Sequence, residues 1–202
     1  MGMSLWLRVS CGLALTALVL VPIGGSPAAS TTTAADKYTV DAIHSSVVFR
    51  IKHLNCSYFY GRFNDVSGGF SIDAANPAAS KIDVEVKTES IDTNNDGRDR
   101  HLKSADFFEV DKHAAIRFVS SSFKKTSENK FDVEGDLTLH GVTRKITTPL
   151  EWVGTGKGIR GEQRGGFEAV FTIKRTDFGM SKLLEGVGDE VRLMISLEGV
   201  KQ

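Results

Sequence analysis

A short stretch near the middle of the chain carries the residue types that acid–base chemistry uses. The segment GRDRHLKSADFF, residues 97–108, places two arginines, two aspartates, a histidine and a lysine ahead of two phenylalanines. Imidazole and carboxylate groups this close together could exchange protons with a substrate or hold a metal ion. A charged run of this kind is also typical of the solvated, ion-paired face of a helix. Which interpretation holds depends on the structural elements around the segment.

The histidines offer one metal hypothesis. They lie at positions 44, 53, 101, 113 and 140, and no two of them have the spacing of a zinc motif. A site could still be assembled in the fold from His44, His53 and His101, and together with Asp106 these residues define a metal-assisted hydrolase as one alternative. The sequence has no nucleophile elbow, phosphate-binding loop or dinucleotide fingerprint. We therefore predict a protein that is not an enzyme and uses no cofactor.

The composition of the chain limits its partners. The 202 residues contain 25 basic and 25 acidic side chains, so the formal net charge is zero and a nucleic-acid partner is not expected. The hydrophobic share of 41% and the charged share of 25% are ordinary for one soluble globular domain.

The first 35 residues differ from the rest. Arg8 is followed by the apolar run GLALTALVLVPIGG, which is short for a membrane-spanning helix, and then by small residues. This pattern predicts a secretory signal peptide and leader tail, residues 1–35, with the mature chain beginning near Ala29 or Asp36. The mature domain, residues 36–202, would be periplasmic or secreted and would have no stable membrane span. A retained membrane anchor is the alternative.

Removal of the leader would leave Cys56 as the single cysteine of the mature chain, so no intrachain disulfide could form. We expect the Cys56 side chain to be packed, although a reactive thiol or a disulfide between chains stays open. A homodimer therefore also stays open.

From Tyr38 onward the sequence alternates between apolar and polar residues, which is typical of β-strands. In residues 81–87, for example, Ile82, Val84 and Val86 alternate with charged side chains. About eight such strands, separated by turn residues, predict an all-β fold with a single antiparallel β-barrel; a sandwich is the alternative. Two adjacent glycines, Gly68 and Gly69, indicate a bulge or sharp bend.

Only the opening segment and residues 55–61 depart from this alternation. Asn95 or Asp96 can cap one short helix, and Ser104 can cap a second that begins at Ala105. The charged segment would then lie on short helices at one end of the barrel.

Six segments resemble, in order and spacing, the motifs of the YceI-like family of exported polyisoprenoid- and lipid-binding proteins. They are YTVDAIHSSVVFRIKHL, GRFNDVSGGFSID, IDTNNDGRDRHLKSADFFEV, IRFVSSSF, GDLTLHGVTRKI and FEAVFTIKRTDFGM. The resemblance implies a lipocalin-like barrel that holds a long amphiphile, such as a polyisoprenoid quinone precursor or a fatty amide, for transport, storage or stress protection. A secreted, partner-binding barrel with a filled core is the non-catalytic alternative.

The strand faces and the resemblance together predict the site. The lipid tail would be lined by inward-facing apolar residues: Phe49, Ile51, Phe63, Val84, Phe107, Phe108, Phe118, Phe131, Leu137, Phe171 and Leu193. The head group would meet a polar rim: Tyr58, Tyr60, Arg98, Arg100 and His101. Each buried CH₂ contributes roughly 0.8 kcal/mol and a net hydrogen bond about 0.5–1.5 kcal/mol, so the tail would dominate the affinity.

Overall fold

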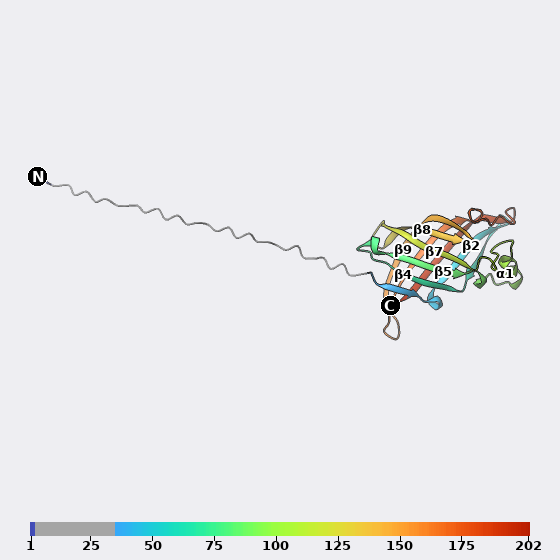
Figure 1. Ribbon diagram of the computed structural model, residues 1–202, viewed down its shortest axis with the longest axis horizontal. Helices are drawn as coiled ribbons and strands as arrows, with labels where there is room; N and C mark the ends of the chain where they lie inside the picture. The colour runs from blue at the N-terminus through green and yellow to red at the C-terminus, as the bar shows by residue number, and fades with distance from the viewer. Residues whose placement is uncertain (3–34) are drawn as a thin grey trace. The chain divides into compact units, whose positions relative to one another are not determined.

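The computed structural model describes residues 1–2 and 35–202, and it shows an all-β protein built around a closed barrel (Figure 1). Nearly all of the predicted leader, residues 1–35, lies outside the described residues. No helix in the described part of the chain is long and apolar enough to span a bilayer. The strands are β1 (Lys37–Val40), β2 (Ser46–His53), β3 (Ser57–Phe63), β4 (Val66–Ser71), β5 (Lys81–Lys87), β6 (Ile91–Asp92), β7 (Ala115–Lys125), β8 (Lys130–Leu139), β9 (Val142–Lys157), β10 (Gln163–Lys174) and β11 (Val187–Lys201).

Eight of these strands close the barrel in the order β1-β4-β5-β7-β8-β9-β10-β11, and β11 pairs back with β1. All of the pairings are antiparallel. The last residues of β11 pair with β1 and its earlier residues pair with β2, so β1 and β2 behave as one interrupted strand. The predicted barrel is thus confirmed, because no sandwich could pair its strands in a complete ring.

Successive side chains of each strand point alternately into the barrel and out to solvent, and this determines which residues fill the barrel. In β8, Phe131, Val133, Gly135, Leu137 and Leu139 are buried, and the residues that alternate with them are more exposed. Gly135 falls on the inward face, where an added Cβ would lie 2.5 Å from the Phe118 ring. A period of two residues is expected of a sheet that has one face packed on the core and the other face exposed to solvent.

The predicted bulge at Gly68 and Gly69 is not formed, since β4 pairs with β1 and β5 without a shift in register. Gly68 is needed for another reason. Its φ is +115°, and an added Cβ would lie 2.2 Å from the backbone oxygen of Asp83. Only glycine combines this backbone conformation with so close an approach of the neighbouring strand.

One short helix, α1 (Asp96–Lys103), lies at the barrel end marked in Figure 1. The Asn95 side chain accepts a hydrogen bond from the Arg98 backbone N–H at 2.9 Å, as the predicted cap should. The second predicted helix is absent: Ser104 closes α1, because its backbone N–H and its hydroxyl both donate to the His101 carbonyl. Residues 105–112 instead form turns.

The turn between β2 and β3 corrects one further expectation. Cys56 is exposed there, and its backbone N–H donates to the His53 carbonyl at 3.1 Å. The prediction of a packed cysteine was wrong, because the hairpin extends past the barrel wall and offers no core at its tip.

Candidate functional site: an apolar cavity in the barrel

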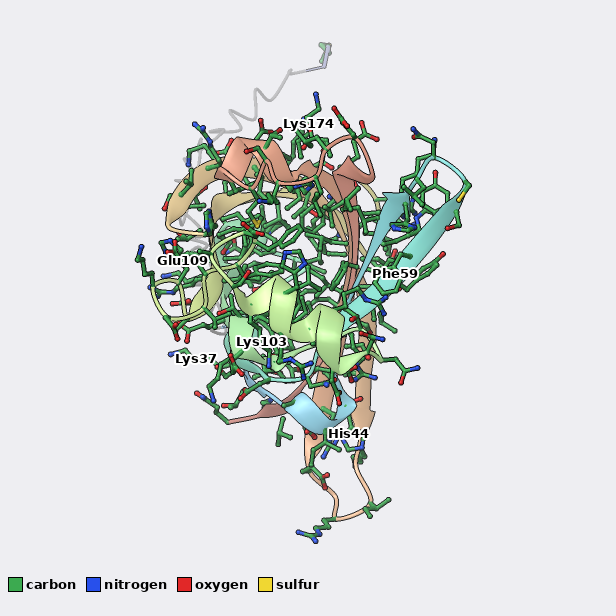
Figure 2. The ribbon with its side chains drawn as sticks, turned by 90° about the vertical axis from the view of Figure 1, so that its right-hand side faces the viewer. Lys37, His44, Phe59, Lys103, Glu109 and Lys174 are labelled. Atoms are coloured by element: carbon green, nitrogen blue, oxygen red, sulfur yellow. The ribbon has the colours of Figure 1, made fainter. Side chains whose placement is uncertain are left out.

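The barrel encloses a cavity of about 390 Å³. Inward-facing side chains from β2–β5 and β7–β11 form its wall, and α1 with the turns that follow contributes one end (Figure 2). The wall is almost entirely aliphatic and aromatic. Its polar members are His53, Arg98, His101, Thr148 and Arg175. A cavity of this character suits an apolar molecule better than a polar one.

The residues predicted to surround a lipid tail lie on this wall with one exception. They are Phe49, Ile51, Phe63, Val84, Phe107, Phe108, Phe118, Leu137, Phe171 and Leu193. Phe131 is the exception: it is 1% exposed and packs edge-on against Phe123, with ring centroids 6.2 Å apart. Phe131 therefore belongs to the solid core beside the cavity.

Two phenylalanines of the opening segment close one end of the cavity. Phe107 is buried and lies edge-on to His101 at 5.1 Å, and Phe108 lies edge-on to Phe63 of β3 at 5.5 Å. Leu102, on α1, packs against the same core. The segment that looked like a reactive cluster thus presents an apolar face to the barrel interior.

Three basic side chains of α1, Arg98, His101 and Lys103, are engaged with groups outside the helix. Arg98 donates from Nε to the Thr93 hydroxyl at 2.9 Å and from Nη2 to the Thr93 carbonyl at 2.6 Å, and its guanidinium lies 4.1 Å from the Phe59 ring. His101 Nε2 lies 3.0 Å from Asp106 Oδ2. Hydrogen bonds from His101 and Lys182 hold the pKa of Asp106 below its usual range. The pairs favour a structural role, although Arg98 and His101 also touch the cavity.

The structure does not bring the whole predicted rim together. Tyr58 and Tyr60 are each 53% exposed and stand outside the cavity, and Arg100 is exposed and does not line it. Phe59, between the two tyrosines, faces inward instead. Its cross-strand partner is Ile51, so the register of the β2–β3 hairpin could have identified Phe59 from the inward face of β2.

Arg175 is a second residue that the sequence analysis missed. It is 3% exposed and lies on the cavity wall, and it donates to the carbonyls of Gly188 at 2.9 Å, Met180 at 2.8 Å and Val187 at 2.8 Å. Burial lowers the pKa of Arg175, while the charge of Asp189 opposes that effect. One cation thus holds both ends of the loop between Met180 and Val187. A single arginine after a strand gives no periodic signal that could have revealed this role.

The predicted metal set is not assembled in the described residues. His44 pairs with Asp41 at 2.8 Å, His53 lines the cavity, and His101 pairs with Asp106. The acidic and histidine side chains that do converge in the described part of the chain form two other groups, and neither contains His53 or His101. The hypothesis of a hydrolase built on these histidines therefore loses its geometric basis.

Comparison with known proteins identifies the barrel. The family model of the YceI-like domain matches residues 38–199, which is nearly all of the described chain. The chain belongs to the YceI-like domain family. A relative from Ectopseudomonas mendocina (strain ymp), described as a UPF0312 protein, is 44% identical over 191 residues, which cover 94% of this chain and 98% of that protein.

Two solved structures show the same fold. The Campylobacter jejuni YCEI protein is 34% identical, with a TM-score of 0.67 over 75% of this chain and 90% of that one. A polyisoprenoid-binding domain from Saccharophagus degradans is 18% identical, with a TM-score of 0.65 over 82% of this chain and 98% of that one. At this identity the second likeness shows the fold alone.

Proposed function

We propose that this YceI-like protein binds a long-chain amphiphile, and a polyisoprenoid in particular, inside the barrel without transforming it. The observation that carries the proposal is the apolar cavity of about 390 Å³ inside the barrel. Its volume falls in the range of roughly 300–1,000 Å³ that is usual for small-molecule sites. The polyisoprenoid-binding domain from Saccharophagus degradans supports the choice of ligand, because it has the same fold.

The wall of the cavity determines where the affinity comes from. Burying each CH₂ of a tail contributes about 0.8 kcal/mol, so a few isoprene units outweigh any one head-group hydrogen bond of about 0.5–1.5 kcal/mol. The cavity would then accept several tails of similar length and discriminate weakly among head groups. Transport, storage and stress protection are all compatible with such a site.

The head group would lie at the α1 end, where Arg98 and His101 touch the cavity. The Thr93 contacts use the Nε and Nη2 atoms of Arg98, which leaves Nη1 to donate to a phosphate or hydroxyl. Arg100, Tyr58 and Tyr60 lie outside the wall and would contribute little. We further propose that the protein is exported to the periplasm or secreted, as the leader pattern of residues 1–35 predicts.

Extraction of the purified protein with organic solvent, followed by mass spectrometry, tests the proposal. We expect a co-purifying isoprenoid or related long-chain lipid in a ratio near one per chain, and uptake of an added isoprenoid alcohol by stripped protein. Protein that is empty as isolated and takes up no isoprenoid would refute it and would favour a partner-binding barrel. The cavity already counts against the filled core which that alternative requires.

The head-group assignment needs a matched pair of variants. We expect the double variant Arg98→Ala/His101→Ala to bind a pyrophosphorylated isoprenoid at least tenfold more weakly while binding the uncharged alcohol nearly as well as the wild type. Arg100→Ala is the control, because it removes a cation from the same helix without altering the cavity wall. Equal losses for both ligands would show that Arg98 and His101 support the fold instead.

A further inference from the structure

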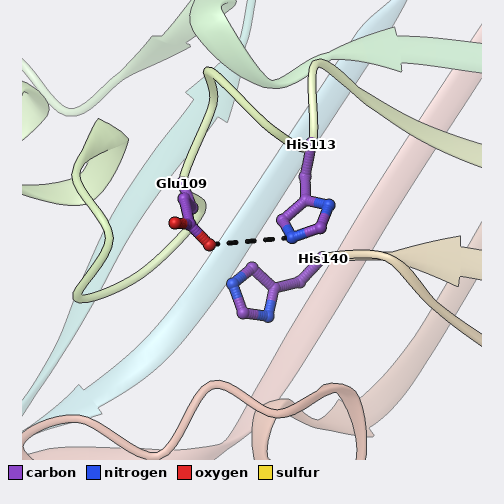
Figure 3. Close-up of side chains that lie close together, drawn as sticks. All are labelled: Glu109, His113 and His140. Atoms are coloured by element: carbon purple, nitrogen blue, oxygen red, sulfur yellow. Dashed lines mark ion pairs between the residues drawn. The ribbon is translucent and has the colours of Figure 1, made fainter.

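A cluster of two histidines and a glutamate lies outside the cavity wall. Glu109 and His113 belong to the turns between α1 and β7, and His140 belongs to the tight turn between β8 and β9 (Figure 3). One ligand atom from each side chain lies within 4.8 Å of the other two. None of the three lines the cavity, so the cluster is separate from the proposed lipid site.

The His140 ring is oriented with a free nitrogen toward its neighbours. Its Nδ1 lies 3.1 Å from the Phe178 carbonyl oxygen. A carbonyl oxygen only accepts hydrogen bonds, so in the neutral ring Nδ1 carries the proton and Nε2 presents a lone pair. That Nε2 atom is buried and has no hydrogen-bond partner. Buried polar atoms without partners are rare enough to need an explanation, and a bound cation would provide one.

His113 is held against the same turn. Its ring centroid lies 4.7 Å from that of His140, with the ring planes 65° apart. A Cβ added at Gly141 would lie 2.6 Å from His113 Cε1, so the absence of a side chain at Gly141 lets the ring pack there. The backbone thus fixes the two imidazoles side by side, as Figure 3 shows.

Glu109 supplies the negative charge. Its Oε1 pairs with Lys112 at 2.6 Å, and its Oε2 lies 3.8 Å from His113 Nε2, which is too long for a hydrogen bond. Oε2 and His113 Nε2 therefore face each other with no direct bond between them.

We propose that Glu109 Oε2, His113 Nε2 and His140 Nε2 bind a divalent transition-metal ion of the Zn²⁺ class. Two imidazoles and a carboxylate form a usual zinc donor set, and water can take the fourth position because the Glu109 and His113 side chains are 23% and 25% exposed. Bonds of about 2.0–2.2 Å in tetrahedral geometry space the ligands about 3.3–3.5 Å apart. From the 4.8 Å limit of the present spacing, the side chains would have to close in by roughly 1 Å.

The contact between Nδ1 of His140 and a backbone carbonyl is the support that metal-bound histidines commonly have. The ion would connect the turns after α1, which carry Phe107 and Phe108, to the β8–β9 turn of the barrel. It would thus fasten the segment that closes the cavity.

The second convergent group differs in a way that makes it a control. Asp41, His44 and Glu198 also lie close together, but Arg164 donates to both carboxylates and holds its cationic side chain among them. Arg164 thus neutralises both carboxylates of this group, whereas Lys112 bonds only Oε1 of Glu109 in the proposed site. His44→Ala therefore removes a histidine that pairs with a carboxylate without touching the proposed site.

Calorimetric titration of Zn²⁺ into untagged, chelator-stripped protein at pH 7.5 tests the proposal. We expect one ion per chain, affinity at least tenfold weaker in His113→Gln and in Glu109→Gln, and no change in His44→Ala. Mg²⁺ and Ca²⁺ should not compete, because they prefer oxygen ligands. Proton NMR should show the ring signals of His113 and His140 shifting on addition of Zn²⁺ while that of His44 stays in place.

Two results would overturn the proposal: no 1:1 binding to the wild type, or a loss in His44→Ala equal to that in His113→Gln. Lipid uptake is not measured in these titrations, so their outcome does not depend on the proposed function. His113 is partly exposed, so His113→Gln should fold; its circular dichroism and melting temperature without metal check this.

Discussion

Replacing Arg175 by Met should destabilise the barrel while leaving its shape intact. Met keeps an unbranched apolar stem but removes the donors that satisfy the carbonyls of Met180, Val187 and Gly188. The bond to Met180 is fully buried, and an acceptor left unpaired there costs about 1–3 kcal/mol. The other two carbonyls are only partly buried, so water can replace the lost donor at about 0.5–1 kcal/mol each.

The sum predicts a free energy of unfolding lower by about 2–5 kcal/mol. For a domain of this size that corresponds to a melting temperature lower by roughly 4–20 °C. The measurement is urea unfolding followed by tryptophan fluorescence, with thermal unfolding as a second readout. Lipid uptake should weaken as well, because Arg175 and Leu183 both line the cavity and the loop between them would loosen.

Arg117→Met is the matched control. Arg117 also makes two short hydrogen bonds, from Nε and Nη2 to Asp83 at 2.9 Å and 2.7 Å, but its side chain is 52% exposed. An exposed ion pair contributes about 0–1 kcal/mol, so this substitution should change little. If the two variants lost the same stability, the three carbonyl contacts of Arg175 would not matter and the argument from burial would be wrong.

Three further perturbations follow from single contacts. Phe49→Asp should abolish isoprenoid uptake in a radiolabel or fluorescence assay, because it places a carboxylate on the apolar wall; normal uptake by a folded variant would show that Phe49 does not face the ligand. Hydrogen bonds from His44 and Arg164 lower the pKa of Asp41 to about 2 from 3.8, so its contribution to stability is present above about pH 4 and is lost as the pH falls towards 2. Asp41→Asn should therefore lower the urea midpoint at pH 7 and make stability depend less on pH between 4 and 2, and an unchanged pH profile would contradict this. Asn95→Ala should cost about 0.5–2 kcal/mol by removing the α1 cap, seen as faster amide exchange in α1, and unaltered exchange would mean that tertiary contacts alone hold the helix.

The sequence could predict the barrel because each strand repeats the same local signal. In β5 the alternation of Ile82, Val84 and Val86 with charged residues gives both the strand and its inner face. The closure of the sheet has no local signal, and it was predicted from the strand count and from the resemblance to a family. The prediction of a second helix failed for a local reason. Ser104 can cap either end of a helix, and the sequence does not say which.

The candidate site was predictable where it followed alternation and not where it depended on tertiary contacts. Ile51 and Leu193 reach the cavity wall because their strands alternate regularly. Phe59 was missed because the flanking tyrosines looked like a polar rim. Its pairing with Ile51 nevertheless places its side chain on the inward face of the hairpin. Arg175 donates to backbone carbonyls 5–13 residues away in sequence. His140 lies against a carbonyl 38 residues away. No pattern of residue spacing encodes such contacts.

The charged segment of α1 acts as a cover over the cavity, because its reactive groups are already engaged while its apolar groups face inward. Arg98, His101 and Lys103 bond to Thr93, Asp106 and Glu89 respectively, which leaves no free acid–base pair aimed into the cavity. An eight-residue helix is too short to be stable alone, so it persists only through these bonds and through packing on the barrel. Elements held in this way open at a lower free energy than the strands beneath them. If the proposed lipid binds, we therefore expect its tail to enter at the end covered by α1, because entry there breaks no pairing in the ring of strands.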